Sequence, residues 1–122
     1  MKYWLRLNHF QIMSRKESER LHDIIDAIAK IESKISSKDN FFDDELLQAF
    51  ALMNLQIIGE ASNKVSPQTL NTNPQVPWRK VIGLGNLIVH EYFRVDLGII
   101  WDVVEQDLPV LKQNIEKMLK ER

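Results

Sequence analysis

The chain has 122 residues and a formal net charge of −1, and 44% of its residues are hydrophobic, which suits one folded domain. It contains no cysteine, which excludes disulfides, thiolate nucleophiles and cysteine-ligated zinc. No apolar run reaches the roughly 18 residues of a membrane span, and the near-neutral charge excludes a broadly basic nucleic-acid coat, so any RNA binding must come from a local patch.

The first fifteen residues carry Lys2, Arg6 and Arg15 without any acidic residue. They lack the apolar block of a secretory signal, and a chain without cysteine fits a reducing compartment, so a cytoplasmic location is predicted. The segment is either a basic arm or a loosely ordered extension, and we expect an extension because chain termini often lack tertiary contacts. The predicted organisation is an N-terminal extension, residues 1–15, and a helical domain, residues 16–122.

The first predicted helix covers about residues 16–36. Its isoleucines and one leucine recur at spacings of three and four, which places them on one buried face: Leu21, Ile24, Ile28, Ile31 and Ile35. Residues 36–40 are rich in Ser, Asp and Asn and predict a turn.

The second predicted helix covers about residues 43–64. Asp43 and Asp44 suit its positive N-terminal end. Its predicted buried stripe consists of Leu46, Phe50, Met53, Ile57, Ala61 and Val65. The next segment, residues 66–77, contains three prolines and predicts a loop.

The third helix is predicted from Pro77 to about Tyr92, and the fourth from Val95 or Asp96 to the C-terminus, with a kink at Pro109. Four amphipathic helices with short connections predict an all-α, up-and-down four-helix bundle, with room for a short extra helix. Small size limits the area that one chain can bury, which favours a homodimer.

The third helix carries a polar stripe as well as core residues. Arg79, Gly83, Asn86 and His90 follow one another at spacings of four, three and four, so they share one face. This face is either a functional surface towards a cleft or a second subunit, or an ordinary exposed face with one surface histidine. Spacing alone leaves both interpretations open.

His90 is the best candidate for chemistry in this stripe. It has no acidic or histidine neighbour at helical spacing that would make a metal site, so no metal is predicted. A single imidazole is also a weak catalytic pair, but a symmetric dimer can bring two copies of His90 together. One imidazole could then accept a proton while the other donates one. Tyr92 either turns back towards the same cleft, if the helix ends there, or packs against the fourth helix.

Three segments together resemble the HepT-like family of HEPN ribonucleases: IIGEA (57–61), PWRKVIGLGN (77–86) and LIVHEYFRVDLGIIWDVVEQDLPVLK (87–112). The resemblance runs from about Glu19 to the C-terminal helix. It implies a helical homodimer that cuts RNA without a metal ion or cofactor. It also implies a toxin whose antitoxin is an MNT-type minimal nucleotidyltransferase that can transfer AMP to Tyr92.

The family motif is an arginine, a polar residue and then H-x-Y, and the resemblance assigns catalysis here to Asn86, His90 and Tyr92. The motif arginine is replaced by Gly85. A guanidinium would stabilise charge on the phosphate during attack, and its loss is worth roughly two to three orders of magnitude in rate, by analogy with an oxyanion-hole donor. Arg79 could compensate, or bind RNA, only from the partner of an antiparallel dimer, because it lies about 16 Å along the helix from His90.

Two functions therefore remain open. The first is an endoribonuclease whose activity is in doubt because of Gly85, and the second is a catalytically disarmed scaffold that still binds its nucleotidyltransferase. The substitution Gly85→Arg would separate them by restoring activity to a disarmed chain. A third interpretation, a nucleotide-binding module, is disfavoured because the chain has no glycine-rich phosphate loop.

Overall fold

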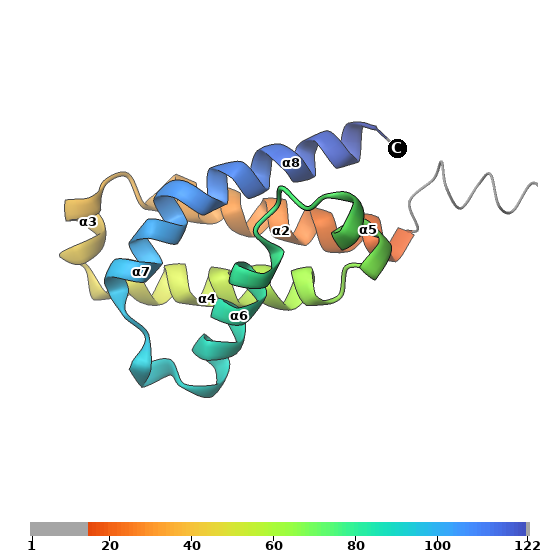
Figure 1. Ribbon diagram of the computed structural model, residues 1–122. Coiled ribbons are helices and arrows are strands. Elements are labelled where there is room, and N and C mark those ends of the chain that lie inside the picture. The colour runs from red at the N-terminus through yellow and green to blue at the C-terminus, as the bar shows by residue number, and fades with distance from the viewer. Residues whose placement is uncertain (1–14, 122) are drawn as a thin grey trace, which may run out of the picture.

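A computed structural model describes residues 15–121 and shows an all-α bundle (Figure 1). Its four longer helices are α2 (Arg15–Lys34), α4 (Glu45–Asn63), α6 (Trp78–His90) and α8 (Leu108–Lys120). The predicted fold class is confirmed. The predicted N-terminal extension lies outside the described residues except for Arg15, which is the first residue of α2. Within residues 15–121, no helix combines the length and apolar character needed to cross a membrane.

Helix α4 is the element on which the bundle is assembled. It contacts α2 and α6, while α8 packs against α2. In Figure 1, α2 and α4 run in opposite directions, and α6 crosses α4 at a steep angle. The loop after α6 leads to α7 (Leu97–Asp102), which lies near the start of α4. This path leaves the C-terminal end of α6 at a corner of the molecule.

The core on the α2 side follows the predicted stripe. Leu21, Ile24, Ile28, Ile31 and Ile35 are all buried. Each fully buried aliphatic side chain of this kind contributes about 1.5–3 kcal/mol relative to an exposed one. The periodicity of this helix was therefore sufficient to orient it.

The predicted buried stripe of α4 is wrong in large part. Ala61 and Val65 are buried and Phe50 is partly buried, but Leu46, Met53 and Ile57 are exposed. The face that meets the core carries instead Ala51, Leu52, Asn54, Leu55, Ile58, Gly59 and Ser62. Apolar residues surround most of this helix, so periodicity offered two possible stripes.

Two short helices occur where turns and loops were predicted. Helix α3 (Lys38–Phe42) begins after Ser37, whose hydroxyl accepts a hydrogen bond from the Asn40 amide, and it is the short extra helix that the prediction allowed. Helix α5 (Pro67–Thr72) lies inside the predicted loop 66–77, which corrects that prediction. Pro67 suits a first helical position, and the hydroxyl of Ser66 caps the helix at Thr69. The cap at Ser66 therefore allows a short helix in a segment whose prolines predicted a loop.

The predicted kink near Pro109 takes the form of a π-helical turn, Val103–Asp107, between α7 and α8. The Leu108 amide donates to the Val103 carbonyl, five residues back. Pro109 has no N–H, and its ring clashes with a regular helical turn, so a wider turn before it accommodates the ring. At the other end, Asp96 caps α7 as predicted and accepts from the Gly98 amide.

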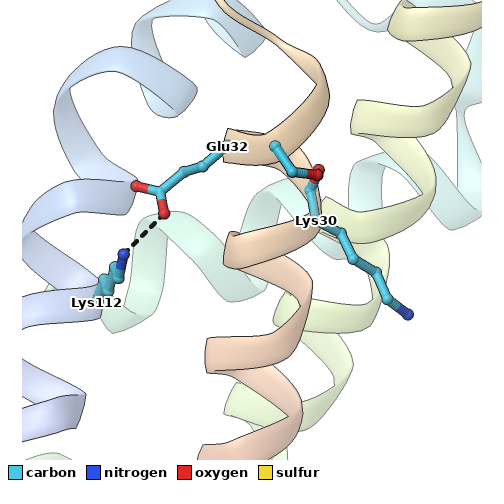
Figure 2. A network of polar contacts seen from close by, with 4 residues as sticks. Lys30, Glu32 and Lys112 are labelled. Atoms are coloured by element: carbon cyan, nitrogen blue, oxygen red, sulfur yellow. Dashed lines mark hydrogen bonds and ion pairs between the residues drawn. The ribbon is translucent and has the colours of Figure 1, made fainter.

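An ion pair joins α8 to α2, and it gives a prediction about alkaline pH. The Lys112 Nζ lies 2.8 Å from the Glu32 carboxylate, while Lys30 points away from this pair (Figure 2). The hydrogen bond and charge of Glu32 raise the pKa of Lys112 above its ordinary value of 10.5. Because the folded-state pKa is the higher one, the stabilisation is fully present below pH 10.5 and is lost as the pH rises through the raised value.

We expect Lys112→Met to lower the free energy of unfolding slightly at pH 7, because the pair is solvent-exposed. The difference from the parent should disappear as the pH passes the raised pKa. Urea unfolding at pH 7, 9 and 11 measures this difference. A difference that did not become smaller between pH 9 and pH 11 would contradict an electrostatic origin of the stabilisation.

Candidate functional site

The polar stripe predicted on the third helix lies on the exposed face of α6. Arg79, Gly83, Asn86 and His90 are all exposed. The opposite face of this helix is buried and carries Trp78, Val81, Leu84, Gly85 and Ile88. The structure therefore brings Asn86 and His90 together on one accessible face, one turn apart.

His90 is the last residue of α6, and the chain turns directly after it. The Glu91 amide donates to the Leu87 carbonyl at 2.7 Å, and a 3₁₀ turn, η1 (Tyr92–Arg94), follows. Because the helix ends before Tyr92, this residue is not held on the far side of α6. Tyr92 is 58% exposed, so its phenol is accessible to solvent at the same corner as His90.

Gly85 is buried where α6 crosses α4, opposite Gly59. A Cβ atom at position 85 would lie 3.0 Å from the Gly59 Cα, and one at position 59 would lie 2.9 Å from the Gly85 Cα. The obstacle in each case is backbone, which cannot rotate away. Position 85 in this chain therefore has no space for a side chain unless α4 and α6 separate.

This packing gives Gly85 a structural role that the sequence alone does not show. From the sequence alone, it is a position that has lost an arginine, and Gly85→Arg is a simple restoration. In the structure, Gly85 and Gly59 form a close helix crossing. A glycine in the middle of a helix already permits the close approach of another helix, but only the contact between α4 and α6 identifies Gly59 as the partner.

The structure also exposes apolar side chains on α4 and at the end of α6, which sequence patterns did not predict. On α4 the exposed side chains of Leu46 (81%), Met53 (53%) and Ile57 form one stripe, which we call the α4 apolar stripe. Next to His90, Val89 is 47% exposed and Phe93 is 85% exposed. An exposed stripe of large apolar side chains such as that of α4 favours contact with a protein.

The chain has two further histidines, His9 and His22. His22 is exposed on α2, and its Nδ1 lies 2.9 Å from the Ser18 carbonyl oxygen, as expected of a surface residue. His9 lies outside the described residues. An open hollow of about 370 Å³ between α3 and α7, lined in part by Phe42, Ile99 and Trp101, contains none of the predicted site residues. Within residues 15–121, three or more potential metal ligands do not gather at any point.

Comparison with known proteins decides the family. The model of the family described as "Ribonuclease HepT-like" matches residues 23–118, which is most of the helical domain. The chain belongs to this family. The resemblance inferred from the motifs around Gly59, Asn86 and His90 is thereby confirmed, and relatives with ribonuclease names support ribonuclease activity.

The HepT-like relatives include archaeal proteins. "Probable ribonuclease HepT" of Thermococcus cleftensis is 34% identical over 110 residues, which cover 88% of this chain and all of that protein. Two proteins of Methanocaldococcus jannaschii, each named "Putative RNase", are 29% and 32% identical, and the alignments cover 85% and 84% of this chain and 98% and 81% of theirs. No solved structure gives a significant match.

Proposed function

We propose that this HepT-like protein is a metal-independent endoribonuclease that acts as a homodimer, with Asn86, His90 and Tyr92 at its active site. The observation that carries this proposal is the placing of Asn86 and His90 on one exposed face of α6, with the accessible Tyr92 directly after the helix. The family and the names of its members point to RNA as the substrate.

The reaction that suits these residues is attack by a ribose 2′-hydroxyl on the adjacent phosphate. One His90 accepts the 2′-hydroxyl proton, and the oxygen forms a bond to phosphorus as the bond to the 5′-oxygen breaks. A second imidazole donates a proton to the departing 5′-oxygen. The products are a 2′,3′-cyclic phosphate and a free 5′-hydroxyl. The amide of Asn86 can donate a hydrogen bond to a phosphate oxygen, and Tyr92 can position the substrate.

The proposed mechanism uses a dimer because, within residues 15–121, one chain offers one exposed histidine at this corner. The α4 apolar stripe, with Val89 and Phe93 beside His90, supplies the surface that a second copy would cover. A twofold axis at this surface would bring the same residues of both copies together. Arg79, too far from His90 within one chain, could then contact RNA or phosphate at the partner's site.

The resemblance also leads us to propose a toxin of a cytoplasmic toxin–antitoxin pair, with an MNT-type nucleotidyltransferase as the antitoxin. The exposure of Tyr92 supports its proposed role as the AMP acceptor, because a modifying enzyme must reach the phenol oxygen. Purified antitoxin, ATP and intact chain should give a mass increase of one AMP, and Tyr92→Phe should remain unmodified.

The test of ribonuclease activity is cleavage of RNA by purified protein in excess EDTA. We expect fragments ending in 2′,3′-cyclic phosphate, and no cleavage of the same sequence made with 2′-O-methyl ribose, which lacks the nucleophile. Cleavage that requires added metal would contradict the mechanism. No cleavage under any condition would favour the alternative function, a disarmed scaffold that binds its nucleotidyltransferase, for which the packed Gly85 is the supporting observation.

The proposed dimer gives a separate prediction. Met53→Glu places a charge in the α4 apolar stripe, and burying an unpaired charge at an interface is costly. We expect a monomer by light scattering, helix content unchanged by circular dichroism, and loss of RNA cleavage. Val110→Glu on α8, at an apolar residue of similar exposure, is the matched control and should remain dimeric. A Met53→Glu protein that stayed dimeric would place the interface elsewhere.

A further inference from the structure

Cleavage by 2′-hydroxyl attack builds negative charge on the phosphate oxygens, and the charge requires a donor beside His90. Position 85 cannot provide one, because Gly85 is packed against the backbone of Gly59. Removal of a donor that meets developing charge costs roughly 10² to 10³ in rate. The amide of Asn86 is an uncharged donor, so a cationic donor for the phosphate must come from another residue.

Three cations belong to α6 and η1, and two of them are poorly placed to contact a phosphate at His90 of the same chain. Lys80 is engaged by Asp107, with 2.7 Å between its Nζ and the carboxylate oxygen. Arg79 lies in the first turn of α6, about 16 Å along the helix axis from His90. Arg94, the last residue of η1, is the third.

The 3₁₀ turn after α6 limits the distance between Arg94 and His90. The Arg94 amide donates to the Glu91 carbonyl at 2.8 Å, and such a turn keeps the two Cα atoms within about 7 Å. The Cα atoms of His90 and Glu91 are about 3.8 Å apart, so the Arg94 Cα lies within roughly 11 Å of the His90 Cα. A phosphate in contact with His90 is thus within reach of a long arginine side chain.

One contact holds the Arg94 side chain, and its guanidinium has further N–H donors. Its Nη1 lies 2.9 Å from a Glu91 carboxylate oxygen, and both side chains remain accessible, at 63% and 42%. A guanidinium has five N–H donors in a planar fork, so the contact with Glu91 leaves donors free for two phosphate oxygens. Glu91 limits the directions that the arginine can take.

We propose that Arg94 binds the scissile phosphate beside His90 and stabilises the charge that develops on it during cleavage. This inference rests on the proposed ribonuclease function. It makes Arg94 a catalytic residue and Glu91 a positioning residue, and it explains how a chain with glycine at position 85 can retain activity.

The test compares Arg94→Ala and Arg94→Lys with the parent in EDTA, on a defined RNA oligonucleotide. We expect Arg94→Ala to lower kcat about 100-fold, and Arg94→Lys to recover part of this loss, because it keeps the charge without the fork. Added guanidinium chloride at millimolar concentration should raise the rate of Arg94→Ala but not that of the parent. Arg15→Ala is the matched control, since Arg15 is an exposed arginine with a local carboxylate partner, Glu19, on α2.

A parent protein that cleaves RNA and an Arg94→Ala variant of equal kcat would overturn the inference while leaving the proposed function intact. If the parent does not cleave, the proposed function fails, and binding of 2′-O-methyl RNA then tests Arg94 directly. Loss of one phosphate contact should weaken binding and reduce the slope of log K against log salt by about 0.7. Unchanged affinity and slope in Arg94→Ala would overturn the inference by this second route.

Discussion

His90→Ala is expected to lower the rate of RNA cleavage about 1000-fold. General acid–base catalysis by a positioned side chain contributes roughly 10²- to 10⁴-fold, and the substitution removes an imidazole from both halves of the proposed dimer. His90 is exposed at the end of α6, where its side chain contributes nothing to the core, so the variant should unfold at the same urea concentration as the parent. Initial rates on a defined RNA in EDTA, measured for preparations purified in parallel, give the ratio.

The matched control for His90→Ala is His22→Ala. His22 is also an exposed histidine, and its ring contacts the Ser18 carbonyl within its own helix. We expect its cleavage rate to equal that of the parent. Equal rates for the parent and His90→Ala would assign the activity to a contaminating nuclease and contradict the proposed role of His90.

Mixed dimers test whether the two His90 imidazoles act as one catalytic unit. When residues act as one catalytic unit, removing one member costs about as much as removing all of them. Dimers that combine an intact protomer with a His90→Ala protomer, isolated with two different affinity tags, should therefore have far less than half of the parent rate. A rate of one half would mean that each protomer works alone.

The second large effect is expected from Gly85→Arg, which should destabilise the fold by about 3 kcal/mol or more, because overpacking a tight contact costs roughly 1–3 kcal/mol even for small additions. The first side-chain atom would already lie 3.0 Å from the Gly59 Cα, so α4 and α6 would have to move apart. Urea unfolding followed by circular dichroism measures the loss. Growth arrest or RNA cleavage gained without loss of stability would contradict the structure at this crossing.

Alanine substitutions distinguish steric conflict at the crossing of α4 and α6 from the general effect of replacing a glycine in a helix. In a helix, alanine is favoured over glycine by roughly 1 kcal/mol. Gly83 is exposed, and apart from its chain neighbours and the nearby backbone of its own helix, no atom of residues 15–121 would lie within 4 Å of a Cβ there, so that preference should stabilise Gly83→Ala. At Gly59 a Cβ would lie 2.9 Å from the Gly85 Cα and 3.1 Å from the Val81 carbonyl oxygen, so steric conflict should exceed the preference and destabilise Gly59→Ala.

Local patterns in the chain were enough to predict much of this molecule. The spacing of Leu21, Ile24 and Ile28 predicts which face of α2 is buried. Asp96 caps α7, and the motif around Asn86 and His90 identifies the family. The polar face of α6 could also be predicted, because residues three and four apart on a helix share a face whatever surrounds them. These features depend on neighbours in the sequence, which is why they could be read without coordinates.

Other features depend on contacts between residues far apart in the chain. Helix α4 is apolar on most sides, so the exposure of Leu46 and Met53 follows from where α2 and α6 pack against it. The role of Gly85 likewise depends on Gly59, a residue on another helix. Side-chain periodicity states which residues share a face, but burial is decided by the elements that cover that face, and this arrangement arises when the helices assemble.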